Sequence, residues 1–274
     1  MKFQNMAFKS FAFLIFIYLG TLTALSMFQN YLIYHPAREK MQVLEHFATT
    51  HKILSWKNAR NETIGWIIPT TNTKSEWHII LFHGNAGMAL NRLYYQEGLE
   101  SVGAMQIHVF EYPGYGARTG KPSQETIANA AVKAFDLLRK QDDKPIFLMG
   151  ESIGCAVAAQ LAAQRPAQVA GLFFITPFNN LIDVGMTHYP FFPLKLFVRD
   201  RYESDRALRH YHGPIAFLLA GRDTTIPPWL SEKLYKDYTG PKKLWRIPEA
   251  DHNTIDFSSS QSWWKEVFEF LVKN

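Results

Sequence analysis

The chain has 274 residues, of which 47% are hydrophobic and 19% charged, a balance that excludes an intrinsically disordered protein and supports a large core. Its net charge of +5 comes without a long basic run, so we expect no nucleic-acid partner. A single cysteine, Cys155, excludes an intrachain disulfide framework and any metal site built from several cysteines.

The N-terminal segment is apolar over the length of a membrane span. Residues 10–37 contain no Asp, Glu, Lys or Arg, and residues 11–28 rise roughly 27 Å as a helix, close to the ~30 Å hydrocarbon thickness of a bilayer. We expect residues 1–35 to form a single-pass membrane anchor with its juxtamembrane segment, and the catalytic domain to lie on the non-cytoplasmic (periplasmic or luminal) side. A cleavable secretory signal is the alternative, because Ala-Leu-Ser at residues 24–26 resembles a cleavage site.

Beyond residue 35, short apolar runs alternate with helix-like stretches, which is typical of an α/β domain with a mostly parallel central sheet flanked by helices. We expect strands at residues 64–68, 77–82, 107–111, 146–149, 169–175, 215–220 and 244–247. We expect helices at residues 88–101, 124–140 and 153–164. Residues 177–214 break the alternation and are predicted to be a short insertion over the active site. One catalytic domain is therefore expected over residues 36–274.

A serine lies between two glycines where a predicted strand meets a predicted helix. The motif is Gly-Glu-Ser-Ile-Gly at residues 150–154, with an apolar strand before it and an Ala-rich stretch after it. Small neighbours allow the sharp turn that presents a serine hydroxyl at a strand end. Ser152 is thus the candidate nucleophile, and an idle serine in a structural turn is the alternative.

A serine nucleophile needs a base, and the base needs an orienting acid. Asp223 follows the predicted strand at 215–220, and His252 follows the strand at 244–247, so both lie in loops at strand ends. The chain order Ser152, Asp223, His252 is the order of an α/β-hydrolase. Asp251 is a rival acid, but its adjacency to His252 makes a good hydrogen bond to the imidazole awkward.

The oxyanion of an acyl-transfer intermediate needs backbone donors. Residues 83–87 read His-Gly-Asn-Ala-Gly directly after the strand at 77–82, and their small side chains let the backbone approach a substrate. We assign the two amides to Asn85 and to Ile153, with Ala86 as the alternative if the turn is shifted. The alternative is a glycine turn that serves only packing, in which case the Asn85 amide has no catalytic role.

No cofactor and no metal are expected. His210 and His212 lie close together, but no acidic or thiol partner accompanies them at a recognisable spacing. Cys155 lies near the predicted N-terminus of the helix at 153–164, where its thiol pKa can be lowered. We expect a packing residue whose slow modification would block the site.

Three motifs together resemble a known group, the membrane-anchored serine hydrolases of the α/β-hydrolase superfamily. They are His-Gly-Asn, Pro-Gly-Tyr-Gly and Gly-Glu-Ser-Ile-Gly, at residues 83–85, 113–116 and 150–154. The resemblance covers nearly the whole chain, and it implies the α/β-hydrolase fold with Ser152, Asp223 and His252 as the triad. It also implies an ester, thioester or amide substrate, often derived from lipid. Glu111, where many relatives have Asp, puts only loop details in doubt.

The expected function is hydrolysis of an ester or thioester of a small acyl or lipid-like molecule through an acyl-enzyme intermediate. Aromatic residues in the insertion at 177–214 either line an acyl slot, touch the membrane surface or fill the core. Two alternatives remain open: a peptidase-like amide hydrolase of the same fold, and a catalytically silent, membrane-tethered binding module.

Overall fold

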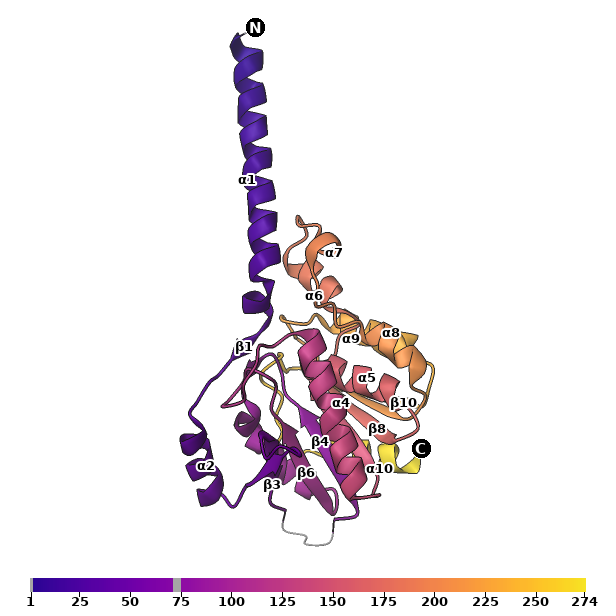
Figure 1. Ribbon diagram of the computed structural model, residues 1–274. Helices are drawn as coiled ribbons and strands as arrows, with labels where there is room; N and C mark the ends of the chain where they lie inside the picture. The colour runs from indigo at the N-terminus through magenta and orange to yellow at the C-terminus, as the bar shows by residue number, and fades with distance from the viewer. Residues whose placement is uncertain (1, 71–74) are drawn as a thin grey trace.

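The computed structural model describes residues 2–70 and 75–274, and Figure 1 shows a sheet with helices on both faces and one long helix projecting from it. The strands of the main sheet are β2 (Leu54–Lys57), β3 (Thr63–Ile68), β4 (Trp77–Phe82), β6 (Met105–Phe110), β7 (Ile146–Glu151), β8 (Val169–Ile175), β9 (Ile215–Ala220) and β10 (Lys242–Ile247). Their spatial order is β10-β9-β8-β7-β4-β6-β3-β2. All neighbours are parallel except β2 with β3 and β3 with β6, so the mostly parallel sheet is confirmed.

All seven strands predicted from the sequence are present, with ends shifted by at most two residues. Most of them were recognisable because strands buried on both faces are nearly continuous apolar runs. The edge strand β10, in which only Trp245 is buried, is an exception. Strand β2 was not predicted, since it is a short edge strand in which only Trp56 is buried. A short edge strand buries little surface and leaves a weak pattern in the sequence.

Adjacent residues of a strand point to opposite faces of the sheet and enter different cores. Ile80 of β4 packs in the core beneath α4 (Gln124–Gln141), α5 (Ile153–Gln164) and α9 (Pro228–Asp237). Its neighbours Ile79 and Leu81 pack on the other face, against α2 (Met41–Thr50) and α10 (Trp263–Lys273). The sheet is therefore covered on both faces, and the carboxyl ends of its parallel strands meet at one edge.

The helices predicted at 124–140 and 153–164 are confirmed as α4 and α5. Ser123 caps α4 by accepting a 3.1 Å hydrogen bond from the Thr126 amide. The helix predicted at 88–101 is instead a 3₁₀ segment, η1 (Ala89–Tyr95), followed by the short α3 (Gln96–Glu100). Its backbone departs from helical geometry at Arg92, whose guanidinium is held by Glu151. A tertiary ion pair thus coincides with the break in this helix.

The N-terminal helix α1 (Lys2–Ile33) extends beyond the predicted residues 11–28 and projects away from the sheet (Figure 1). Its segment Phe8–Ile33 has 26 residues and contains an 18-residue stretch with a mean hydropathy of 2.1, long and apolar enough to cross a membrane, although a signal sequence meets the same test. Strand β1 (His35–Pro36) follows it and pairs in parallel with β5 (Ala86–Gly87), the segment just after β4. The end of α1 is thereby joined to the loop at the carboxyl end of β4.

The insertion (residues 177–214) contains four short helical segments. They are α6 (Leu181–His188), α7 (Leu194–Phe197), α8 (Ser204–Ala207) and η2 (Leu208–His210). Figure 1 shows α6 and α7 beside the lower half of α1, and Tyr18 of α1 contacts this region through a 3.0 Å hydrogen bond to the carbonyl of Phe191. The part of the insertion that contains α6 and α7 therefore lies beside α1, whereas α8 and η2 pack against α5.

Candidate active site

The turn between β7 and α5 holds Ser152 in a conformation that few residues other than glycine adopt, with φ of 55° and ψ of −119°. A Cβ at Gly150 would lie 2.5 Å from the Cys155 backbone, and a Cβ at Gly154 would lie 2.0 Å from the carbonyl oxygen of Phe82. Both positions therefore require glycine for close packing of the turn against β4 and α5. This packing holds the Ser152 side chain at the carboxyl end of the sheet.

Cys155 is fully buried in the first turn of α5, and its Sγ contacts the carbonyl oxygens of Gly150 and Ile175 at 3.1 and 3.2 Å. Burial raises the thiol pKa well above its ordinary value. The expectation of a modifiable thiol was therefore wrong, because desolvation outweighs the helix N-terminus. Its role as a packing residue is confirmed.

His252 and Asp223 meet although they lie in different loops. The Nδ1 atom of His252 is 2.7 Å from Oδ2 of Asp223. The other carboxylate oxygen of Asp223 accepts hydrogen bonds of 2.9 and 2.7 Å from the amides of Thr225 and Ile226. Asp223 is buried, so these bonds fix its carboxylate and orient the imidazole with Nε2 free for another partner.

The rival acid, Asp251, has other partners. Its Oδ1 accepts hydrogen bonds of 2.8 Å from the Thr224 amide and 2.7 Å from the backbone amide of His252. The Thr224 and His252 amides hold the pKa of this carboxyl below its ordinary value. The imidazole pairs with Asp223, and Asp251 instead ties the Asp223 loop to the His252 loop.

Ser152 and His252 face adjoining hollows. Ser152 lines a cavity of about 510 Å³, while His252 lines a neighbouring cavity of about 420 Å³ beside Tyr94 and Glu151. Within residues 2–70 and 75–274, no hydrogen bond joins the Ser152 hydroxyl to the imidazole. Hydrogen bonds between a nucleophile and its base are often long without substrate and tighten when it binds.

The first hollow, which we call the Ser152 cavity, is lined by Ser152, by Asn85 after β4, and by Ile153, the first residue of α5. Asn85 and Ile153 are the residues whose backbone amides are expected to hold the oxyanion. In the described part of the chain, neither amide donates a hydrogen bond to a protein acceptor. Amides at a helix N-terminus commonly lack such partners and are available to an anion. Ala86, the alternative donor, does not line the cavity.

The walls of the Ser152 cavity are mostly apolar. The insertion contributes Phe178, Leu181, Val184, Tyr189, Phe192 and Leu194. Helix α1 contributes a second wall with Leu25, Leu32 and Ile33. A mostly apolar cavity with a few polar groups fits a ligand with a long apolar part.

Glu151, inside the motif next to Ser152, forms a largely buried ion pair with Arg92. Two hydrogen bonds of 3.0 Å join the guanidinium to the two carboxylate oxygens, and the hydroxyls of Tyr94 and Tyr95 also donate to this carboxylate at 3.2 Å. Burial opposes its charge, but Arg92 outweighs burial and lowers the pKa of Glu151. The sequence analysis did not predict this ion pair, because its two residues lie far apart in the chain.

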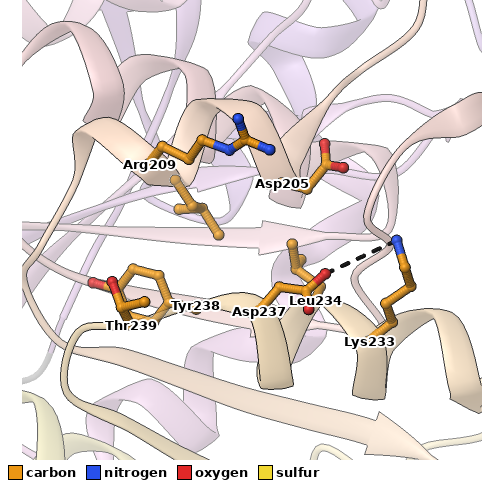
Figure 2. Close-up of a pocket in the computed structure, with 8 residues that line it drawn as sticks. Asp205, Arg209, Lys233, Leu234, Asp237, Tyr238 and Thr239 are labelled. Carbon is orange, nitrogen blue, oxygen red and sulfur yellow. Dashed lines mark ion pairs between the residues drawn. The ribbon is translucent and has the colours of Figure 1, made fainter.

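A separate cavity of about 590 Å³ lies between η2 and α9 (Figure 2). It is lined by charged and polar side chains, including an exposed pair in which Lys233 Nζ and Asp237 Oδ2 are 3.9 Å apart. None of the site residues predicted from the sequence borders it. Such a pair, one helical turn apart, is common on solvated helix faces.

Comparison with known proteins adds to this geometry. A family model described as alpha/beta hydrolase fold matches residues 78–202. An uncharacterized protein of Mycobacterium tuberculosis is 33% identical over 212 residues, which cover 76% of this chain and 74% of that protein. The chain belongs to the α/β-hydrolase family.

Other relatives of this α/β-hydrolase carry functional names. Lysophosphatidylserine lipase ABHD12 of Mus musculus is 28% identical over 211 residues, which cover 70% of this chain and 52% of that protein. The solved structure of the Pyrococcus furiosus esterase Pf2001 has a TM-score of 0.63 and 18% identity, and covers 88% of this chain and 97% of its own. This second likeness supports the fold.

The sequence analysis also did not predict that α1 lines the Ser152 cavity of this α/β-hydrolase. Thr21, Leu25 and Gln29 follow one another at intervals of four residues and border the Ser152 cavity. Gln29 gave a signal that was available in the sequence, since it and the adjacent Asn30 are two amide side chains in a segment without charged residues. A buried amide side chain requires hydrogen-bond partners, and it therefore indicates a contact.

Proposed function

We propose that this protein is a membrane-anchored serine hydrolase that cleaves an ester or thioester of a small acyl or lipid-like molecule. The observation that carries the proposal is the arrangement around the cavity edge. Ser152 is held in a strained turn beside Asn85 and Ile153, whose amides donate to no protein acceptor among the described residues, and the His252 imidazole is oriented by Asp223.

In this mechanism, Nε2 of His252 takes the proton of the Ser152 hydroxyl while Oγ attacks the substrate carbonyl carbon. The amides of Asn85 and Ile153 donate to the resulting oxyanion, and Asp223 stabilises the imidazolium through Nδ1. Collapse breaks the bond to the alcohol or thiol, which leaves with the proton from His252. Water then attacks the acyl-enzyme with His252 as base, and it releases the acid and restores Ser152.

The apolar walls of the Ser152 cavity support an acyl substrate. The name of the mouse relative, a lysophosphatidylserine lipase, supports an ester of a lipid that keeps one acyl chain. Oxygen and sulfur esters share the same carbonyl chemistry with this triad, so both remain within the proposed substrate class.

The proposal also includes a location at the membrane. Helix α1 anchors the chain in a membrane, and the catalytic domain at residues 36–274 lies on the non-cytoplasmic side. The support is the length and hydropathy of Phe8–Ile33 together with Lys2 and Lys9, which precede or begin the span.

Labelling of the folded full-length protein with a fluorophosphonate tests the proposal without knowledge of the natural substrate. Wild type and a control variant at the exposed Ser259, Ser259→Ala, are expected to react, and Ser152→Ala is expected not to react. Turnover of acyl esters above aminoacyl amides is expected in the same preparations. Absence of labelling in folded wild type would favour the silent binding module, and faster amide cleavage would favour the peptidase-like alternative.

A further inference from the structure

One face of α1 borders the Ser152 cavity. Thr21, Leu25, Gln29 and Leu32 recur at intervals of three or four residues, so their side chains lie along the same side of the helix. Ser152 lines the same cavity from the sheet. The helix that is long and apolar enough to cross a membrane is therefore also a wall of the hollow in front of the proposed nucleophile.

Hydrogen bonds hold this wall against the insertion. Gln29 is 3% exposed, and its Oε1 accepts a 2.8 Å hydrogen bond from the Arg199 amide while its Nε2 donates to the carbonyl of Phe197 at 3.3 Å. Directly after the end of α1, the Tyr34 hydroxyl donates a 2.6 Å hydrogen bond to Asp200. Contacts at both positions, made by one short segment of the insertion (residues 197–200), give α1 a defined place relative to the cavity.

The insertion reaches to the depth of the apolar part of α1. The Tyr18 ring stacks on Phe192 with centroids 6.1 Å apart, and its hydroxyl donates to the carbonyl of Phe191. Phe191 and Leu196, near the tip, are 86% and 83% exposed. Large apolar side chains beside a membrane-length helix are favourably placed in lipid, so a membrane-anchored α1 would bring the tip of the insertion, beside the cavity, to the bilayer.

The dimensions of the wall fit a single acyl chain. From Ile33 to Thr21 the wall extends about 18 Å along the helix axis at ~1.5 Å per residue. One leaflet contributes about half of the ~30 Å hydrocarbon thickness of a bilayer. An acyl chain that lies along α1 therefore reaches from lipid to the neighbourhood of Ser152.

We propose that α1 is a substrate-binding element, in which Thr21 and Leu25 set the acyl-chain length that the Ser152 cavity accepts, and that the chain enters sideways from the membrane. This inference rests on the proposed hydrolase function and deepens it. In this proposal α1 both anchors the protein and forms part of the binding site, because removal or displacement of the helix would open one side of that site.

Alkyl fluorophosphonates with an ethyl or a dodecyl chain test the proposal on full-length protein in phospholipid nanodiscs. Both reagents phosphonylate the proposed nucleophile with loss of fluoride, and the proposal predicts that only the dodecyl chain extends to Leu25. We expect Leu25→Trp to lower the ratio of dodecyl to ethyl labelling rates by about tenfold, since an indole occupies space needed by several methylenes. The control Met27→Trp, at a residue that is 68% exposed and does not line the cavity, should keep the wild-type ratio.

A second variant guards against misfolding of the first. Leu25→Ala enlarges the cavity and should shift the preferred chain towards hexadecyl, whether or not Leu25→Trp folds. Wild-type ratios in both Leu25 variants would overturn the role of α1, while ethyl labelling at Ser152 would leave the proposed function intact. Failure of wild type to react with either reagent would instead refute the hydrolase proposal on which this one depends.

Discussion

The side-chain amide of Asn85 donates a 2.9 Å hydrogen bond to the carbonyl oxygen of Ile33, the last residue of α1. The backbone carbonyl of Asn85 accepts a second bond, of 3.0 Å, from the His35 amide. The loop proposed to hold the oxyanion is thus fastened to the end of the N-terminal helix. Oxyanion stabilisation requires donors fixed in advance, so this link connects the placement of α1 to catalysis.

Loss of this link should slow the chemical step. Asn85→Ala keeps the backbone N–H but removes the bond to Ile33, and we expect kcat for a short acyl ester to fall about tenfold with a smaller change in KM. Steady-state kinetics with p-nitrophenyl butyrate measure this. Asn30→Ala, which removes a 3.3 Å bond from α1 to Pro122 away from the cavity, is the matched control. Equal kcat values in the two variants would contradict a positioning role for the Asn85 side chain.

The two neighbouring carboxylates should differ sharply in their effect on turnover. In Asp223→Asn the remaining oxygen is held by the Thr225 and Ile226 amides, so an NH2 donor faces His252 Nδ1. We expect kcat to fall by roughly 10³–10⁴-fold because the imidazole loses its required tautomer. Asp251→Asn changes only the bonds between loops and should cost less than about tenfold. Single-turnover rates of both variants decide the matter. A larger loss in Asp251→Asn would reverse the assignment of the acid.

Close packing at the turn should make Gly154 intolerant of a methyl group. Its Cβ would approach the Phe82 carbonyl oxygen to 2.0 Å, so Gly154→Ala is expected to lower the free energy of unfolding by about 3 kcal/mol. Gly20→Ala in α1 meets nothing within 4 Å and should leave the unfolding midpoint unchanged or slightly raised. Thermal unfolding of both variants in the same detergent provides the comparison. Coincident midpoints would show that the backbone at the turn relaxes freely.

Stability should decline in mild acid because of a buried imidazole. Burial and the nearby His78 lower the pKa of His108 to about 3, while the unfolded chain protonates this group near pH 6.5. Its contribution is present above pH 6.5 and is lost as the pH falls towards 3, by about 2 kcal/mol between pH 7 and pH 5. Denaturant unfolding at these two pH values should show a smaller difference in His108→Phe than in wild type. The same change at the exposed His212 should preserve the wild-type difference; an unaltered difference in His108→Phe would exclude His108 as its source.

Much of the fold was determined by local sequence. The buried parallel strands are near-continuous apolar runs, and the turn at Ser152 needs glycine on either side of it within two residues. These signals lie within short windows, so the seven strands, α4, α5 and the positions of Ser152, Asp223 and His252 at strand ends were accessible without coordinates. The break in the helix predicted at 88–101 was not, since it coincides with the ion pair of Arg92 with the distant Glu151.

Only the tertiary structure decided which groups meet at the site. The pairing of His252 with Asp223, the pair of Glu151 with Arg92, and the desolvation of Cys155 each depend on distances between segments that the sheet brings together. The contribution of α1 to the wall of the Ser152 cavity likewise depends on contacts between distant segments. Hydropathy identifies the helix as apolar but does not distinguish a side chain in lipid from one against a cavity, and the contacts of Gln29 with the insertion make that distinction.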